Sequence, residues 1–312
     1  MSSLNTIVDR VYVINLDKDK ERMEHMDRQC KEHQINYVRF PAVLGAKVEK
    51  DARLSPTCQI FCTDGAKGCA LSHHTIWKTM LQENLQTVLV LEDDVIFTKD
   101  LETKLQIAFR EIPQFDIVYL CNTYNPKNEN FFSHLAISLG GIQPQDHSPL
   151  LKKTKGGFGT AAYIIHQDFV RKIIDKPITQ HIDYQLSQWL QELNGQAYAF
   201  TDFAVKVDES PFESNLADSF PILLNSVLKQ IKLKDTPDLS WILNENIIKL
   251  GPFNLNLLIV SLMIAVLFTP KQFFWGWGLW LLIEGLLAKD IKNILRYGVF
   301  LGMSIVLRFQ FG

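Results

Sequence analysis

The sequence predicts an α/β domain followed by an apolar helical tail, and three stretches of the chain carry this prediction. Residues 88–97, VLVLEDDVIF, begin with an uninterrupted apolar run that is typical of a strand buried on both faces. Residues 11–40 have the strand–helix–strand order that opens nucleotide-binding α/β domains. From residue 253 onward the chain is dominated by long apolar stretches with few charges.

Composition and motifs narrow the class of protein. A chain of 312 residues can form one large or two ordinary domains, and its net charge of −2 gives no indication of nucleic-acid binding. Neither GxGxxG nor GxxxxGKS occurs, which argues against dinucleotide oxidoreductases and P-loop proteins. The polar N-terminus, MSSLNTIVDR, has no signal-peptide core.

The five cysteines are odd in number and include no CxxC pair. This pattern argues against a disulfide framework and favours ordinary thiols in a reducing compartment. Cys58 and Cys62 form a C-x3-C spacing that is weak evidence for zinc, and buried thiols are the simpler expectation.

The predicted elements follow one another along the chain with helical or strand spacing. Short apolar runs predict the strands, and apolar residues at three- and four-residue intervals predict the helices. Residues 122–149, rich in Asn, Pro, Ser and Gly, are long for a connection and predict a functional loop. The predicted strands are 11–16, 37–40, 88–97, 115–120, 161–165 and 198–207, and the predicted helices are 18–33, 65–80, 100–111, 168–174 and 184–193, the last directly after Asp183.

Residues 65–80, GAKGCALSHHTIWKTM, predict a glycine turn leading into a helix. Glycines before a helix allow an anion to approach the backbone, the helix N-terminus favours negative charge, and Lys67 adds a cation. In the alternative interpretation, Gly65 and Gly68 only shape a turn and His73 is a hydrogen-bonded core residue.

Glu92, Asp93 and Asp94 stand at the end of the predicted central strand. Clustered carboxylates at such a position are costly, because like charges raise one another's pKa and resist desolvation. A divalent cation removes that cost, and oxygen ligands suit Mg²⁺ or Mn²⁺. Ligands of open α/β sheets bind at the carboxyl ends of strands, where this cluster falls. An exposed acidic turn is the alternative.

Several motifs together resemble glycosyltransferase family 25, which includes bacterial lipopolysaccharide and lipooligosaccharide enzymes and collagen galactosyltransferases. The resemblance rests on VYVINLDKDKERM, RFPAVLG, GAKGCALSHHTIW, VLVLEDDVIF, GTAAYII and HIDYQL, in this order. It covers most of residues 8–220 and excludes the tail. It implies a GT-A-like, Rossmann-type fold with a mixed central sheet, a nucleotide-sugar donor that is usually UDP-linked, and inverting chemistry.

The resemblance also implies roles for particular residues. It places Asp94, with Glu92, on a Mn²⁺ or Mg²⁺ ion that holds the donor diphosphate. The positions that match donor-facing motifs are Asn15, Leu16, Asp17, Arg22, Lys67, Gly68, Ser72, His73, Glu92 and Asp93. One departure is the segment VDESPFESN, where many members have a Gln, so the role of Asp208 in that loop stays open.

Asp183 matches the later acidic position of the family and is our candidate for the catalytic base. Inversion requires a base that takes the proton of the acceptor hydroxyl opposite the leaving group. A metal-binding or acceptor-binding role and simple helix capping are the alternatives for Asp183.

The tail predicts membrane association. Residues 253–268 and 273–288 are apolar but slightly shorter than the roughly 20 residues of an untilted span, and residues 297–307 form a third apolar stretch. We expect either a two-helix hairpin across the membrane, which the basic residues on its cytosolic side would orient, or a shallow hairpin in one leaflet. Glu284 favours the shallow hairpin, since an acid deep in a membrane is costly. Buried helices or a dimer interface are the alternative.

Taken together, the sequence predicts three regions: a catalytic domain over 1–220, a linker or amphipathic segment over 221–250, and the membrane-associated tail over 251–312. The predicted function is a metal-dependent hexosyltransferase of surface-polysaccharide synthesis, with a cytosolic catalytic domain, a UDP-linked donor such as UDP-galactose, and a glycan or lipid-linked acceptor. A non-catalytic nucleotide-sugar-binding or scaffold protein is the alternative, and a metal-dependent phosphohydrolase is a third.

Overall fold

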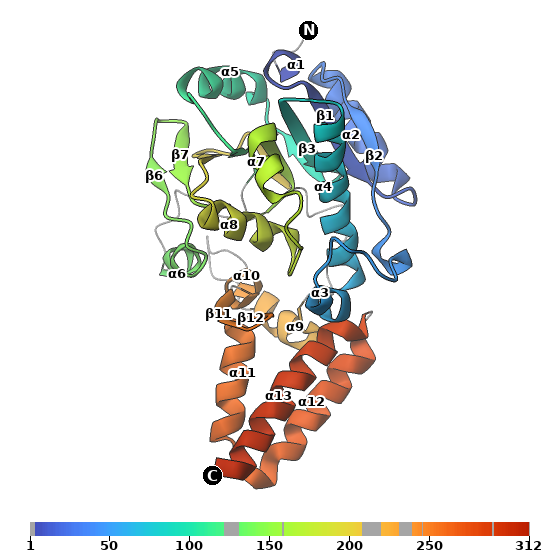
Figure 1. Cartoon of the computed structure of the whole chain (residues 1–312), viewed down its shortest axis with the longest axis vertical. Helices are drawn as coiled ribbons and strands as arrows, with labels where there is room; N and C mark the ends of the chain where they lie inside the picture. The colour runs from blue at the N-terminus through green and yellow to red at the C-terminus, as the bar shows by residue number, and fades with distance from the viewer. Residues whose placement is uncertain are drawn as a thin grey trace.

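A computed structural model shows a sheet domain with a helical unit attached below it (Figure 1). The central sheet has the strand order β2-β1-β3-β8-β5-β9-β7-β6. The structure describes residues 4–121, 131–157, 159–207, 220–230, 239–244, 246–288 and 290–311.

The sheet is mixed, as predicted. Strand β1 is parallel to β2 and β3, and β5 is parallel to β9, whereas β8 runs antiparallel to both β3 and β5. Strand β7 is antiparallel to β9 and to β6. The strands are β1 (Arg10–Asn15), β2 (Val38–Pro41), β3 (Thr87–Glu92), β5 (Ile117–Tyr119), β6 (Gln145–Asp146), β7 (Leu151–Thr154), β8 (Ala162–His166) and β9 (Ala197–Phe200).

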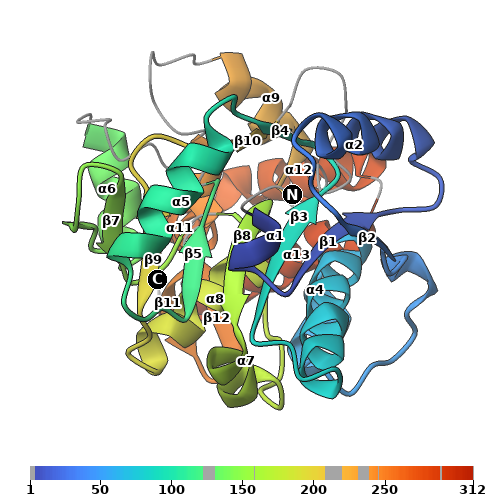
Figure 2. The ribbon, with the colours of Figure 1, turned by 90° about the horizontal axis from the view of Figure 1, so that it is seen from above.

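Helices cover both faces of this sheet (Figure 2). Alternate residues of β3 enter different cores: Leu89 and Leu91 pack on one side, and Val88 and Val90 on the other, as the two-residue period of a strand requires. The first core includes residues of α1 (Leu4–Ile7), α2 (Lys20–Glu32) and α5 (Leu101–Glu111), and the second includes residues of α4 (Asp64–Gln82), α7 (Gln167–Ile173) and α8 (Ile182–Glu192).

Three predicted stretches differ from the structure. The strand predicted over 88–97 is interrupted by a turn at Asp93 and Asp94, and β4 (Val95–Phe97) pairs with β10 (Val205–Val207) in a separate small sheet. The strand predicted over 198–207 is therefore divided between β9 and β10. The predicted loop contains α6 (Phe131–Leu139) and β6, while its residues 122–130 lie outside the described residues.

The predicted glycine turn before α4 is wrong, because both glycines lie inside the helix. Helix α4 begins at Asp64, and the side chain of Thr63 accepts a hydrogen bond from the backbone of Ala66. A Cβ on Gly68 would lie 2.4 Å from the carbonyl oxygen of Val43, so Gly68 allows the helix to pack closely on the loop that leads to η1 (Gly45–Lys47). The glycine serves packing within the fold.

The expectation that all five cysteines are free thiols is also wrong. A disulfide joins Cys58 to Cys62 across one turn of α3 (Pro56–Phe61), where a spacing of four residues places the two side chains on the same side. Cys30, Cys69 and Cys121 are free.

The C-terminal region forms a helical unit with a small core of its own. Its buried residues include Leu258, Ile259, Tyr297 and Phe300. Part of the segment predicted as a linker is ordered here, and residues 253–256 form a strand in place of the predicted start of a helix. The elements are α9 (Ile222–Gln230), α10 (Leu239–Asn244), β11 (Asn246–Leu250), β12 (Phe253–Asn256), α11 (Leu257–Phe268), η3 (Lys271–Phe273), α12 (Phe274–Leu287) and α13 (Ile291–Phe311).

The expectation of a transmembrane helix is not met. Among the residues that the structure describes, no helix combines the length and apolar character that a membrane span requires. Helices α11 and α12 have 12 and 14 residues, about 18 and 21 Å at 1.5 Å per residue, against a hydrocarbon core of about 30 Å.

Glu284, the acid that disfavoured a deep span, has a structural role. It is fully buried, and its carboxylate accepts hydrogen bonds from the backbone N–H groups of Leu223 and Leu224 in the first turn of α9. A carboxylate at this position also interacts favourably with the positive end of the helix dipole.

Candidate functional site

The acidic cluster lies where the ends of β1 and β3 meet the start of β8. Because β8 is antiparallel to β3, the residues that precede β8 lie beside the last residues of β3. The backbone N–H of Glu92 donates to the carbonyl of Ala161 at 2.8 Å. This pairing brings Asn15, Glu92 and Thr160 to one edge of the sheet.

Asp93 is held by two residues from the first strand and helix. Asn15 Nδ2 donates to Asp93 Oδ2 at 2.6 Å, and Arg22 Nη1 donates to Asp93 Oδ1 at 2.9 Å. Arg22 also reaches Asp94 Oδ2 at 3.3 Å. Burial raises the pKa of Asp93, and the bonds to Arg22 and Asn15 oppose that shift. These three residues, each predicted to face the donor, lie together in the structure.

Asp94 is the residue of the cluster whose charged form the surroundings stabilise least. Burial, followed by the nearby charge of Glu92, raises the pKa of Asp94 to about 7. Its Oδ1 is buried and has no hydrogen-bond partner within the described part of the chain. A cation beside this oxygen would stabilise the ionised carboxylate.

Thr160 connects the cluster to Asp183. Its Oγ1 lies 2.5 Å from Asp183 Oδ1 and 3.0 Å from Glu92 Oε1, and its single proton can be donated to only one of them. Asp183 Oδ2 lies 3.3 Å from Nδ1 of His181. Burial alone would raise the pKa of Asp183, but His181 and Thr160 together hold it below its ordinary value. Asp183 is therefore ionised at neutral pH.

His73 approaches the cluster from α4. Its Nδ1 lies 2.9 Å from the hydroxyl oxygen of Tyr163, which also accepts a hydrogen bond from Trp77 Nε1 at 3.0 Å. Its Nε2 lies 3.5 Å from Glu92 Oε1 without a hydrogen bond. The imidazole is thus fixed with one nitrogen turned toward Glu92.

Other predicted residues make contacts away from this cluster. Asp17 forms an exposed ion pair with Arg39, and half-buried Leu16 follows the last residue of β1. The Lys67 ammonium donates to the carbonyl of Gln59 at 2.7 Å. Asp290 of the tail accepts a hydrogen bond from the backbone of Asp64, so a protein carboxylate already binds the N-terminus of α4.

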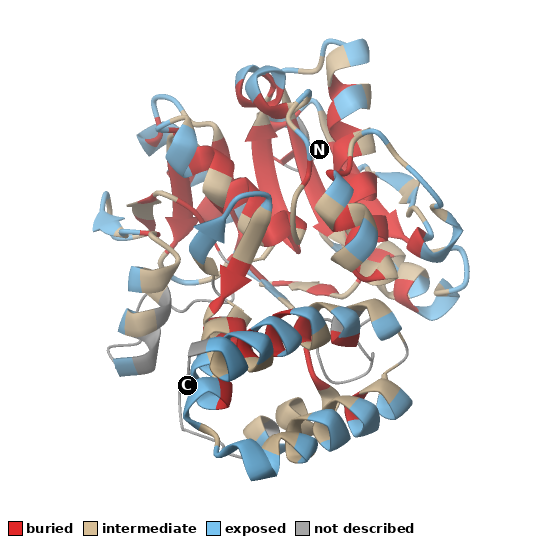
Figure 3. Cartoon of the chain, turned by 60° about the horizontal axis from the view of Figure 1, so that its bottom comes forward, coloured by how far each residue is buried: buried red, intermediate tan, exposed pale blue. Residues whose placement is uncertain are grey.

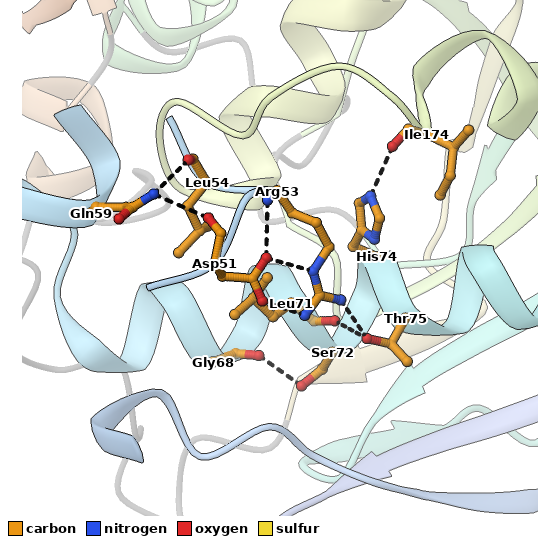
Figure 4. Close-up of polar contacts among 10 residues, drawn as sticks. All are labelled: Asp51, Arg53, Leu54, Gln59, Gly68, Leu71, Ser72, His74, Thr75 and Ile174. Carbon is orange, nitrogen blue, oxygen red and sulfur yellow. Dashed lines mark hydrogen bonds and ion pairs between the residues drawn. The ribbon is translucent and has the colours of Figure 1, made fainter. Parts of the chain in front are cut away.

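Two buried polar side chains of α4, Ser72 and His74, serve the fold (Figure 4). Ser72 donates to the carbonyl of Gly68 and accepts from the backbone N–H of Val43. His74 lies 2.9 Å from the carbonyl of Ile174. Ser72, predicted to face the donor, therefore connects α4 to the loop before η1.

Sequence reasoning did not assign Thr160, His181, Tyr163 or Cys69 to the site. Thr160 and His181 flank elements that were predicted, but no local pattern shows that β8 is antiparallel to β3. That pairing creates the contact between Thr160 and Glu92.

A hollow lies on the face of α8 that carries Tyr184, Gln188 and Gln191. It has a volume of about 260 Å³ and is bordered by β11, β12 and the end of α6. Its lining is rich in amide side chains: Gln180, Gln188, Gln191, Asn246 and Asn254. Amides with an adjacent aromatic ring suit a neutral polyhydroxylated ligand.

Comparison with known proteins gives a family match over the sheet domain. The model of glycosyltransferase family 25 (LPS biosynthesis protein) matches residues 8–185, more than half of the chain. This range contains the whole acidic cluster, together with Thr160, His181 and Asp183.

Three relatives illustrate the similarity. A glycosyltransferase 25 family member of Drosophila melanogaster is 32% identical over 126 residues, covering 36% of this chain and 21% of the relative. Procollagen galactosyltransferase 1-A of Xenopus laevis is 33% identical over 128 residues, with coverages of 36% and 21%. Lipooligosaccharide biosynthesis protein lic2B of Haemophilus influenzae is 24% identical over 173 residues, with coverages of 52% and 61%. The matched region spans about a fifth of the length of the first two relatives.

Proposed function

This chain belongs to glycosyltransferase family 25, and we propose that it transfers a sugar from a nucleotide donor to a glycan or lipid-linked acceptor. The observation that carries the proposal is the cluster of Glu92, Asp93 and Asp94 at the carboxyl edge of the sheet. Ligands of open α/β sheets bind at this edge. Relatives of this chain are named for galactosyl transfer and for lipooligosaccharide synthesis, so we propose a hexose donor, such as UDP-galactose, and a surface-polysaccharide acceptor.

The cluster fits a divalent cation. Asp94 presents a buried carboxylate oxygen without a hydrogen-bond partner among the described residues, and Glu92 is the neighbouring acid. We propose that these two residues hold Mn²⁺ or Mg²⁺, for which carboxylate oxygens are suitable ligands. When bound, the ion would stabilise the charge that develops on the departing diphosphate.

Asn15 and Arg22 orient the cluster for this role. By binding both oxygens of Asp93, they fix the turn that follows β3; Arg22 also binds Oδ2 of Asp94 and leaves its Oδ1 without a hydrogen-bond partner among the described residues. Nearby Leu16 and Asp17 extend the same edge and are proposed to lie along the nucleotide. A preorganised site of this kind does not have to reorganise when the donor arrives.

Asp183 is proposed as the base of an inverting reaction. Its lowered pKa favours the ionised carboxylate at neutral pH. The hydroxyl group of Thr160 lies between this carboxylate and that of Glu92 and contacts both. Asp183 could therefore accept the proton of an acceptor hydroxyl while that oxygen attacks the anomeric carbon. His181, at 3.3 Å, would orient Asp183 and stabilise its charge.

The amide-lined hollow on α8 is proposed to hold part of the acceptor. Asp183 and Tyr184 are adjacent on α8, so the hollow and the proposed base belong to one element. Leu139 and Gly140, from the segment that the sequence suggested as acceptor-facing, also border it.

The helical tail is proposed to rest on the cytosolic face of a membrane, at the level of one leaflet. Many residues of the C-terminal helices are exposed (Figure 3). They include large apolar residues such as Phe268 (83%), Trp275 (68%) and Leu286 (77%). Apolar surface of this extent on a folded protein is characteristic of a membrane or protein contact. Aromatic residues at one end of the unit suit the lipid interface.

The test of the proposed function is a panel of nucleoside diphosphate sugars added to the full chain with Mn²⁺. Thermal shifts would identify the donor, and release of the free nucleotide would measure its turnover. We expect one donor class to stabilise the protein and to be hydrolysed slowly without acceptor. Binding without turnover, with or without acceptor, would instead support a non-catalytic nucleotide-sugar-binding protein.

A further inference from the structure

We propose that Cys69, His73 and Glu92 form a second metal site, selective for a zinc-type ion, behind the acidic cluster. One atom from each residue can be chosen so that all three lie within 4.8 Å of one another: the thiol sulfur, an imidazole nitrogen and a carboxylate oxygen. This site shares Glu92 with the proposed donor metal site, but its other two ligands come from α4, and it requires neither donor nor acceptor.

The backbone places these side chains together. Cys69 and His73 are four residues apart on α4, so they project from the same face of the helix on successive turns. Glu92 is the last residue of β3, and its backbone is fixed by the bond to Ala161. A helix and a strand thus supply the ligands, which gives a more rigid arrangement than loops would.

His73 supplies the second observation. Its side chain is fully buried, and Nε2 has no hydrogen-bond partner within the described residues, although it lies 3.5 Å from Glu92 Oε1. Nδ1 is paired with the hydroxyl of Tyr163. When Nδ1 carries the proton and donates it to Tyr163, the lone pair of Nε2 points toward the carboxylate. Two electron pairs facing each other in this way are stabilised by a cation between them.

The neighbours of the three ligands also fit a metal site. Metal-binding histidines generally donate their second N–H to an oxygen, and metal-binding carboxylates accept further hydrogen bonds. Tyr163, itself fixed by Trp77, is placed for the first role. Thr160 takes the second role when its hydroxyl proton is directed to Glu92 and not to Asp183.

The ligand types determine the class of ion. A thiolate and an imidazole select zinc-type transition metals over Mg²⁺ and Ca²⁺, which prefer oxygen alone. Ligand atoms around a tetrahedral zinc ion lie roughly 3.3–3.8 Å apart. A separation of 4.8 Å between two of the present ligand atoms would therefore have to shorten by about 1 Å when the ion binds. Three protein ligands leave a fourth position open, and partly exposed Cys69 and Glu92 give the ion a path of entry.

The test uses Co²⁺ as a spectroscopic substitute for Zn²⁺ in the full-length protein after removal of bound metals. A Co²⁺ ion bound to a thiolate gives an intense charge-transfer band that oxygen ligands do not give. We expect this band in the wild type, its loss in Cys69→Ser and His73→Asn, and its displacement by Zn²⁺. Circular dichroism checks that each variant is folded.

Matched variants exclude other sources of the band. Cys121→Ser removes another buried free thiol, and the double substitution Cys58→Ser with Cys62→Ser removes both sulfurs of the disulfide as a source of thiols. Both should keep the band. Asp94→Asn should also keep it while losing metal-dependent donor turnover, which separates this site from the proposed donor site. Absence of the band in the wild type, or its retention in Cys69→Ser, would overturn the proposal.

Discussion

Replacing Asp94 with Asn should make the metal-free protein more stable at alkaline pH. The Asp94 carboxyl has a pKa of about 7, mainly because burial and Glu92 disfavour its charged form. In the unfolded chain its pKa returns to about 4. The folded state therefore binds more protons than the unfolded state between these values, and stability falls as the pH rises through 7. An Asn side chain does not ionise, so the variant does not lose stability in this way as the pH rises.

The magnitude follows from the difference in pKa. With a folded pKa of about 7 and an unfolded pKa of about 4, the penalty is about 4 kcal/mol at pH 8 and declines to about 1–2 kcal/mol at pH 5. The attraction of Arg22 is already included, because it is one of the charges that set this pKa. Arg22 keeps its bond to Asp93 in the variant. The stability gained by the substitution should therefore be at least about twice as large at pH 8 as at pH 5.

Urea denaturation in EDTA, followed by tryptophan fluorescence, measures this difference. Trp77 is fully buried beneath the sheet and reports on the domain that contains the cluster. Asp146→Asn, on an exposed side chain of β6, is the matched control and should change stability little at either pH. A variant at position 94 that is less stable than the wild type at pH 8, or whose effect is the same at both pH values, would refute the reasoning.

The other predictions concern catalysis, the tail and membrane contact. Asp183→Asn should lower kcat by at least about 100-fold with nearly unchanged donor affinity, since a base acts in the transition state; steady-state kinetics checks this, and a collapse of donor affinity would place Asp183 in the donor site. Glu284→Ala should lower the free energy of unfolding by about 1–3 kcal/mol, because the backbone N–H groups that donate to Glu284 lose their acceptor. Glu284→Gln retains an acceptor oxygen and should lower it less in the same denaturation assay. The double substitution Phe268→Asp and Trp275→Asp should reduce flotation with anionic liposomes without changing the circular dichroism spectrum; undiminished flotation would show that these side chains do not make the contact.

The residues of the first half of the site could be selected from the sequence because their motifs are local. The end of β1, the start of α2 and the turn after β3 each carry a recognisable pattern. The parallel pairing of β1 with β3, which brings Asn15 and Arg22 to Asp93, is seen only in the structure. The boundaries of β3 were less accurate, because an apolar run that continues beyond the turn hides the change of sheet at Val95.

The second half depends on contacts that no local pattern encodes. Thr160 meets Glu92 only because β8 is inserted antiparallel between β3 and β5. At the start of α4, where the sequence predicted an anion site, the carboxylate of Asp290, more than 200 residues later in the chain, accepts a hydrogen bond from the backbone of Asp64, and no local pattern encodes this contact either. In the tail, the apolar composition indicated an unusual surface. The packing of three helices around Tyr297 could not be predicted from the sequence and is seen only in the structure.

The most direct test of the account is donor hydrolysis by the wild type and by Asp94→Asn, with Mn²⁺ and with EDTA. The donor is the nucleotide sugar that the thermal-shift panel selects, and Asp146→Asn again serves as the control. We predict turnover by the wild type and the control only when Mn²⁺ is present, and no turnover by folded Asp94→Asn in either condition. Full turnover in EDTA, or a fully active Asp94→Asn variant, would contradict the assignment of the acidic cluster as the donor metal site.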